Sequence, residues 1–278
     1  MSVITFWSNG EEQTGKTVSM VAIATYMAIQ HNYKILLIST GYKDEVLNNC
    51  FWKPKKEKKN MGIFGPNTNA GMGEGIEGLS REAKTNRLQP ENITNYAKIV
   101  FKDRLEILQG YSGGKAQYEE IRTTYPEIIN LANKYYDLVF VDLDKQVDKE
   151  IEEEILKNSN LIIANLSQRL TSIDRFMEIR KEKPILNEQK TLILIGRYDK
   201  FSKYNIKNVS RYMKEKNNIS TIPYNTLFFE ACEEAKVADL FLKLRNVDTE
   251  DRNGFFLSEV KRVIDNIIYR LQNLQMKM

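Results

Sequence analysis

The sequence predicts an α/β fold built on one mostly parallel, twisted sheet of about seven strands with helices on both faces. A glycine-containing loop at residues 10–17 lies between a short apolar strand at 3–7 and an apolar helix at 18–29. A second apolar strand at 34–38 follows that helix at the length of a β-α-β unit, which requires a parallel pair with a right-handed crossover. Apolar strands and amphipathic helices then alternate along the rest of the chain.

The first loop carries the strongest chemical signal. Residues 10–17 read GEEQTGKT and fit the phosphate-binding pattern G-x-x-x-x-G-K-[S/T] without a gap. Glycines at both ends let the backbone curl so that several N–H groups converge on a polyphosphate, and the helix N-terminus adds partial positive charge. Lys16 is expected to reach the β- and γ-phosphates, and the Thr17 hydroxyl to bind Mg²⁺. The predicted contacts of the nucleotide are Gly10, Glu11, Glu12, Gln13, Thr14, Gly15, Lys16, Thr17 and Val18.

Five further strands are expected after the first two. They are assigned to residues 105–108, 136–142, 161–166, 191–196 and 220–225. Helices are expected at 76–88, 90–96, 119–134, 172–183, 204–214, 228–240 and 257–274. The strand that ends in Asp142 matters most, because a carboxylate at a strand tip opposite Lys16 and Thr17 can hold Mg²⁺ directly or through water.

Length and composition restrict the class of protein. With 278 residues, 42% of them hydrophobic, and no Pro/Ser-rich linker, the chain is expected to form one domain, residues 1–278. No basic leader and no apolar run of ~18 residues is present, so a cytoplasmic protein is expected. Two distant cysteines and a single histidine exclude a Cys/His zinc site and a histidine-based triad, so any metal must be held by oxygen.

The regular pattern is lost between residues 49 and 75. This stretch is predicted to be a flexible insertion, basic in its first half and rich in glycine in its second. Its lysines allow a contact with DNA or an anionic membrane, but a solvated charge run is the favoured interpretation, and the net charge of +4 is too small to indicate a dedicated nucleic-acid protein. The lysines concerned are Lys53, Lys55, Lys56, Lys58 and Lys59.

The C-terminal helix carries one wide apolar stripe at helical spacing. Such a stripe fits either burial against the sheet or adsorption to a membrane surface. The polar face mixes both signs of charge and offers little attraction to anionic lipid, which favours burial. The stripe consists of Phe256, Leu257, Val260, Val263, Ile264, Ile267, Ile268, Leu271 and Leu274.

Four landmarks together resemble the MinD/ParA family of P-loop ATPases over nearly the whole chain. They are the loop at 10–17, the strand that ends in Asp142, the GRYD segment within 192–199, and IPYN at 222–225 with FEAC at 229–232. The resemblance implies a bacterial, cytoplasmic protein that binds ATP or ADP with Mg²⁺ and forms a nucleotide-dependent homodimer. It implies a role with a protein partner in positioning a plasmid, a chromosome, the division machinery or a pilus or secretion system, with recruitment to the inner membrane face or a cell pole.

Carried over to this sequence, the resemblance assigns Arg197 and Pro223 to the base pocket. Two departures affect the expected activity. Glu11 replaces a lysine that in the family reaches the partner's phosphate, and residues 39–41 read STG where the family has two acids, the second of which orients the attacking water. Nucleotide binding is therefore expected, with weak or absent hydrolysis. The missing lysine makes the chain similar to the TadZ/CpaE-type pilus-localising branch.

Two other interpretations stay open at this stage. A scaffold that keeps the fold but has lost nucleotide would explain Glu11, Glu12 and the STG segment, although it leaves the intact Lys16 and Asp142 unexplained. A small-molecule P-loop enzyme of the dethiobiotin synthetase type would need charged substrate-binding residues around the carboxyl edge of the sheet, and no such constellation is seen.

Overall fold

The computed structural model describes residues 1–10, 13–53, 75–85, 88–216, 218–247 and 251–276. In these residues eight strands form one sheet in the order β3-β4-β2-β5-β1-β6-β7-β8. Neighbouring strands are parallel except for the antiparallel pair β3 and β4, so the prediction of a mostly parallel α/β sheet is confirmed. The strands are β1 (Ser2–Ser8), β2 (Ile35–Ser39), β3 (Lys98–Phe101), β4 (Leu105–Leu108), β5 (Leu138–Asp142), β6 (Leu161–Leu166), β7 (Thr191–Tyr198) and β8 (Ile219–Pro223).

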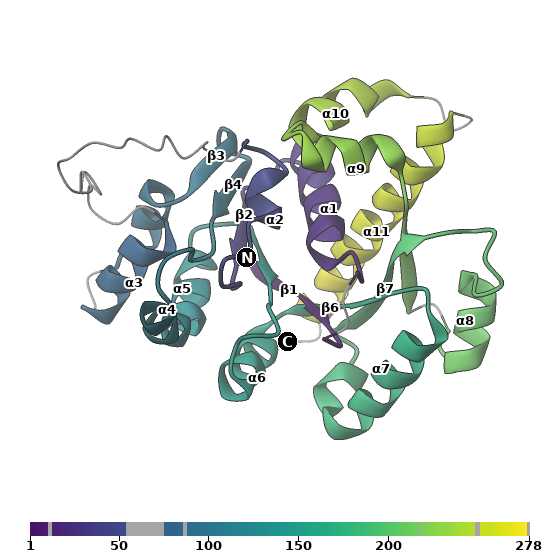
Figure 1. The fold of residues 1–278 in the computed structure, drawn as a ribbon, viewed down its shortest axis with the longest axis horizontal. Helices are drawn as coiled ribbons and strands as arrows, with labels where there is room; N and C mark the ends of the chain where they lie inside the picture. The colour runs from purple at the N-terminus through teal and green to yellow at the C-terminus, as the bar shows by residue number, and fades with distance from the viewer. Residues whose placement is uncertain (11–12, 54–74, 86–87, 217, 248–250, 277–278) are drawn as a thin grey trace, which may run out of the picture.

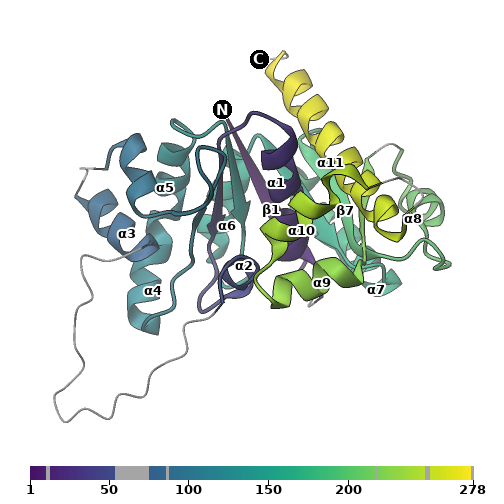
Figure 2. The ribbon, with the colours of Figure 1, turned by 90° about the horizontal axis from the view of Figure 1, so that it is seen from above.

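Helices cover both faces of this sheet (Figures 1 and 2). On one face lie α1 (Lys16–Gln30), α9 (Thr226–Glu233), α10 (Val237–Lys243) and α11 (Arg252–Gln275). On the other face lie α3 (Ile76–Lys84), α4 (Lys115–Ile121), α5 (Tyr125–Ala132), α6 (Lys149–Asn158), α7 (Leu170–Glu182) and α8 (Ile206–Met213). Alternate residues of each strand enter alternate cores. In β5, for example, Phe140 packs on the side of α1 and Val141 on the side of α5.

The first helix crosses the middle of the sheet. Every residue from 19 to 28 is buried, because β1 and β5 lie beneath α1 while α10 and α11 flank it. This explains why the sequence is apolar on all sides of the helix. The aromatic rings of Phe228, Phe241 and Phe256 pack together beside it, which joins α9, α10 and α11 into one layer.

Three sequence predictions about elements need correction. The eighth strand, β3, was missed because it has only four residues, and its short apolar run at 99–101 is half-buried or exposed at the edge of the sheet. The helix expected at 119–134 is two helices, α4 and α5, separated by a 3₁₀ turn at Arg122–Thr124, with Pro126 in the first turn of α5, where it costs no hydrogen bond. The helix expected at 228–240 is divided at Ala235, whose φ of 60° ends α9.

The C-terminal helix packs against the body of the protein, as predicted. It begins at Arg252, five residues before the expected start, behind the Asp251 cap that accepts a hydrogen bond from Asn253 N at 2.7 Å. Its apolar stripe lies against β8 and α1. Its buried Glu259 accepts a hydrogen bond from Thr221 and pairs with Arg262 at 2.7 Å. Among the described helices, none is long and apolar enough to cross a membrane.

Most of the predicted insertion at 49–75 lies outside the described residues. This includes Lys55, Lys56, Lys58 and Lys59, whose contact with DNA or membrane stays a prediction. Lys53 is described and is exposed, four residues beyond the short helix α2 (Val46–Asn49).

Candidate functional site

The candidate site lies at the carboxyl edge of the sheet, beside its central strand. β1 lies between β5 and β6, and the chain leaves β1 through the loop at residues 10–17. In the sheet register, Asp142 at the end of β5 lies between Phe6 of β1 and Ser39 of β2. In open α/β sheets the ligand binds at this edge, where connections leave the central strand in opposite directions.

The loop between β1 and α1 follows a tight, left-handed path. Gly10 and Gly15 have φ values of 79° and 72°, and Gln13 between them has 65°. Gly15 is also the residue before the first turn of α1, and a Cβ there would lie 3.3 Å from Cγ of Arg197. The loop therefore presses against the end of β7 and presents the N-terminus of a fifteen-residue helix to the cavity. Glu11 and Glu12 lie outside the described residues.

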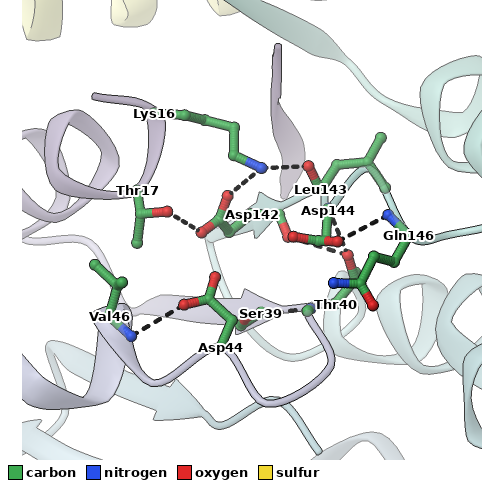
Figure 3. Close-up of polar contacts among 11 residues, drawn as sticks. Lys16, Thr17, Ser39, Thr40, Asp44, Val46, Asp142, Leu143, Asp144 and Gln146 are labelled. Carbon is green, nitrogen blue, oxygen red and sulfur yellow. Dashed lines mark hydrogen bonds and ion pairs between the residues drawn. The ribbon is translucent and has the colours of Figure 1, made fainter. Parts of the chain in front are cut away.

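Three side chains converge beneath this loop (Figure 3). Lys16 Nζ lies 2.8 Å from Asp142 Oδ1 and also donates to the carbonyl oxygen of Leu143. The Thr17 hydroxyl donates to Asp142 Oδ2 at 2.6 Å. Asp142 is only 2% exposed, so its charge depends on these two partners. The structure thus brings Lys16 and Thr17 into contact with Asp142, which lies 126 residues after Lys16 and 125 residues after Thr17 in the chain.

The donor set fits a magnesium ion. Mg²⁺ prefers oxygen ligands and commonly takes one or two from the protein and the rest from phosphates and water. The adjacent Thr17 hydroxyl and Asp142 carboxylate are such a pair. No group of three or more His, Cys, Asp or Glu side chains in the described part of the chain is arranged to hold a metal ion. A magnesium ion here would therefore also need the phosphates of a nucleotide.

Two cavities meet at this site. The phosphate-side cavity, about 530 Å³, is lined by Gly10 and residues 13–18 of the loop, with Asp44, Asp144 and Lys145 also in its wall. The apolar cavity, about 370 Å³, is formed by the start of α1, by α2, by the end of β8 and by α9, and Pro223 is part of its lining. Val18, Val46 and Arg197 line both cavities. A cavity lined by charged side chains such as Lys16, Asp44 and Asp144, adjacent to an apolar cavity, suits a ligand with a charged tail and a flat, apolar end.

Arg197 lies at the junction in an unusual backbone conformation. Its φ is 50°, a left-handed value that non-glycine residues seldom adopt, and the pairing of β7 with β8 shifts register between Ile195 and Tyr198. Such a bulge redirects a side chain that would otherwise follow the alternation of the strand. The Arg197 side chain is exposed, and no ion pair within the described part of the chain occupies it. It is therefore available to an anionic or aromatic ligand in either cavity.

Gly196 has a structural role that the sequence comparison did not reveal. A Cβ at this position would lie 2.2 Å from the carbonyl oxygen of Thr14. The phosphate-binding loop therefore crosses β7 at a point where only glycine leaves room for its backbone.

We expect Gly196→Ala to displace the loop. Because the obstacle is backbone rather than a mobile side chain, the cost should be ~1–3 kcal/mol, a fall of several degrees in Tm, together with a weaker response to added nucleotide. Gly114→Ala is the matched control, since a Cβ there meets nothing within 4 Å. The measurement is the Tm of both variants, with and without Mg-ATP. Equal melting temperatures for the two variants would contradict the close contact between position 196 and the Thr14 carbonyl oxygen.

Asp44, Asp144 and Lys145 are cavity residues that sequence reasoning missed. All three lie in loops that leave the carboxyl ends of β2 and β5, and that placement was the available signal. Burial raises the pKa of Asp44 above its ordinary value, and the nearby charges of Asp142 and Asp144 add to this, while the Val46 N–H and Lys16 act in the opposite direction.

The two cysteines lie together on the wall of the apolar cavity. Both are free, and Cys50 follows α2 while Cys232 belongs to α9. A hydrogen bond with Cys232, together with burial, raises the pKa of the Cys50 thiol far above its usual range. Cys50 is therefore a protonated, weakly nucleophilic thiol that contributes packing to the cavity.

The sequence matches no protein-family model and no curated protein. The structure is similar to a ParA family ATPase from Chlorobium tepidum TLS, with 14% identity, coverage of 94% of this chain and 96% of that one, and a TM-score of 0.69. It is also similar to the septum site-determining protein MinD in complex with Mg-ADP from Pyrococcus horikoshii OT3, with 14% identity, coverage of 96% and 97%, and a TM-score of 0.65.

A third similar structure is a plasmid partition protein from Borrelia burgdorferi B31 bound to AMPPNP. It is 16% identical, the match covers 99% of this chain and 98% of that one, and the TM-score is 0.59. All three matches span nearly the full length of both chains, so the likeness is not confined to one part of the fold. The chain therefore has the P-loop fold of the ParA and MinD ATPases.

Proposed function

We propose that this protein binds ATP and ADP with Mg²⁺ and uses the bound nucleotide to control a homodimer that positions a cellular cargo. The observation that carries the proposal is the junction at Arg197. There the cavity lined by Lys16 and Thr17, the two partners of Asp142, meets the apolar cavity. Charged groups at one end and apolar side chains at the other match the polarity of a nucleotide. The positioning role is supported by the fold shared with ParA-family, MinD and plasmid partition proteins.

Each residue of the site has a defined task in this proposal. Lys16 exchanges Asp142 for the nucleotide phosphates, and the loop backbone and the α1 N-terminus bind the same phosphates. Asp142 and Thr17 hold Mg²⁺, which would neutralise phosphate charge. Arg197 and Pro223 contact the base from the junction and from the end of β8. Gln13, Thr14 and Val18 complete the wall, and Glu11 and Glu12 belong to the same loop.

Slow hydrolysis and a protein partner are parts of the same proposal. A lysine that could neutralise charge on a partner's phosphate is replaced by Glu11, and the end of β2 carries no acid. The partner and cargo are proposed by class only, as a pilus or secretion apparatus or a plasmid or chromosome. Membership of the TadZ/CpaE-type branch stays a prediction from the sequence.

The dimer is tested by measuring molar mass in solution with no nucleotide, with Mg-ADP and with Mg-AMPPNP. We expect a monomer without nucleotide or with ADP, and a dimer with the ATP analogue, because the γ-phosphate alone distinguishes the two ligands. Lys16→Ala should stay monomeric in all three conditions. A mass that does not change while AMPPNP binds would remove dimerisation from the proposal. Failure of the intact protein to bind any of the nucleotides would favour the scaffold alternative.

A further inference from the structure

A carboxylate without an assigned role faces the phosphate-side cavity. Asp44 lies in the loop between β2 and α2 and lines that cavity with the phosphate-binding residues. Figure 3 shows its carboxylate directed toward Asp142, at the edge of the sheet where Thr17 and Lys16 also meet. One of its oxygens, Oδ1, accepts the Val46 N–H at 3.0 Å, which fixes the direction of the side chain.

The three carboxylates of this region differ in what they are free to do. Asp142 is fully engaged by Lys16 and Thr17. Asp144 uses Oδ1 to cap the backbone N–H of Gln146 at 2.8 Å in its own loop. Asp44 forms no ion pair within the described part of the chain, and its second oxygen, Oδ2, has no hydrogen-bond partner there. Asp44 therefore has an acceptor oxygen available in the cavity where phosphate is expected.

The position of Asp44 depends on the glycine three residues before it. A Cβ at Gly41 would lie 2.7 Å from Cβ of Asp44 and 3.3 Å from its Oδ2. The Asp44 side chain thus fills the space that a side chain at position 41 would occupy. A carboxylate from further along the loop therefore lies close to the end of β2, although β2 itself ends without an acid.

The loop that carries Asp44 is held in place from several sides. The Thr40 hydroxyl donates to the Asp142 carbonyl at 3.1 Å and accepts the Asp144 N–H at 2.8 Å. The Tyr118 hydroxyl donates to the Thr40 carbonyl at 2.9 Å, and the Lys43 N–H donates to the Tyr111 carbonyl at 2.9 Å. These bonds fix both ends of the turn before a ligand binds. Asp44 is therefore held in place in advance, which is what a side chain needs in order to orient a small molecule.

We propose that Asp44 is the catalytic carboxylate of ATP hydrolysis, accepting a hydrogen bond from the water that attacks the γ-phosphorus. The inference rests on the proposed ATP-binding function, and turnover stays slow because Glu11 replaces the lysine that would neutralise phosphate charge. The water oxygen bonds to the γ-phosphorus while the bond from that phosphorus to the β–γ bridging oxygen breaks. The electron pair of the broken bond leaves with ADP, and the proton of the water passes through Asp44 to the released phosphate. A single oriented acceptor of this kind contributes ~10²–10⁴-fold to such a step.

The test compares three nearly isosteric variants of the full chain, with Mg-ATP as the substrate. Asp44→Asn removes the proposed acceptor. Asp144→Asn removes the rival carboxylate of the same cavity. Glu45→Gln is the matched control, because Glu45 is the exposed carboxylate next in the chain and does not line the phosphate-side cavity. Phosphate release, ATP affinity by calorimetry, and the identity of the nucleotide retained after incubation, by chromatography, are measured for each.

We expect Asp44→Asn to lower turnover at least tenfold, to bind ATP within threefold of the unaltered protein, and to retain ATP where the unaltered protein retains ADP. Glu45→Gln should match the unaltered protein in all three measurements. Three results would each overturn the assignment of Asp44 and leave the proposed binding function intact. The first is unchanged turnover in Asp44→Asn, and the second is a loss of turnover confined to Asp144→Asn. The third is an unaltered protein that binds ATP without measurable turnover. Absence of ATP binding in the unaltered protein would overturn both proposals.

Discussion

Replacement of Lys16 by alanine should weaken ATP binding at least tenfold. The ammonium group is expected to make charge-assisted contacts to two phosphates, each worth ~1.5–3 kcal/mol. The same substitution leaves the buried Asp142 without its cation at 2.8 Å, so the free energy of unfolding should also fall. Binding is measured by calorimetry well below the melting temperature of the variant, with far-UV circular dichroism to verify the fold.

The control for this variant is Lys115→Ala. Lys115 is the first residue of α4 and follows Gly114, just as Lys16 is the first residue of α1 and follows Gly15, but Lys115 is exposed and makes no contact with the cavities. The control should bind ATP as the unaltered protein does. Equal affinity of the folded Lys16→Ala protein and its control would contradict the assignment of the loop.

Removal of residues 257–278 should give an insoluble or unfolded protein. The deletion takes six buried apolar side chains of α11 out of the core, each worth ~1.5–3 kcal/mol, against a total stability of ~5–15 kcal/mol for a typical domain. It also removes Glu259, the hydrogen-bond partner of the Thr221 hydroxyl. The six are Leu257, Val260, Val263, Ile264, Ile267 and Leu271.

Single substitutions keep this prediction testable if the truncated chain cannot be purified. Ile267→Ala, at a fully buried position, should cost ~2–5 kcal/mol, while Lys261→Ala on the exposed face should change stability little. Chemical denaturation measures both. A truncated protein that stays soluble with an unchanged Tm and loses binding to anionic vesicles would identify α11 as a membrane anchor instead.

The strands were predictable because both faces of the sheet are covered. Seven strands appear in the sequence as mostly apolar segments, since each is buried by helices on either side. β3 is an antiparallel edge strand of only four residues, and its short apolar run at 99–101 was not enough to predict a strand. The breaks between α4 and α5 and between α9 and α10 come from single local conformations, such as that of Ala235, which an apolar pattern does not report.

The site was predictable where its chemistry is contiguous in the chain. The loop from Gly10 to Thr17 is recognisable because one turn must supply all the phosphate contacts, and Asp142 follows from its place at a strand end. Asp44 was not predictable, since its position over Gly41 depends on how the loop after β2 folds back. The need for Gly196 likewise arises from the Thr14 carbonyl, 182 residues earlier in the sequence.

The most direct test of the account is a calorimetric titration of the intact protein with ATP, in the presence and absence of Mg²⁺. Two joined cavities with one set of phosphate ligands predict a single site per chain, saturable by ATP and ADP, and weaker without the metal because Asp142 and Thr17 then lose the ion they share with the phosphates. The account would be contradicted if neither nucleotide bound at concentrations up to ~1 mM with Mg²⁺ present. That limit corresponds to a standard free energy of binding weaker than about −4 kcal/mol.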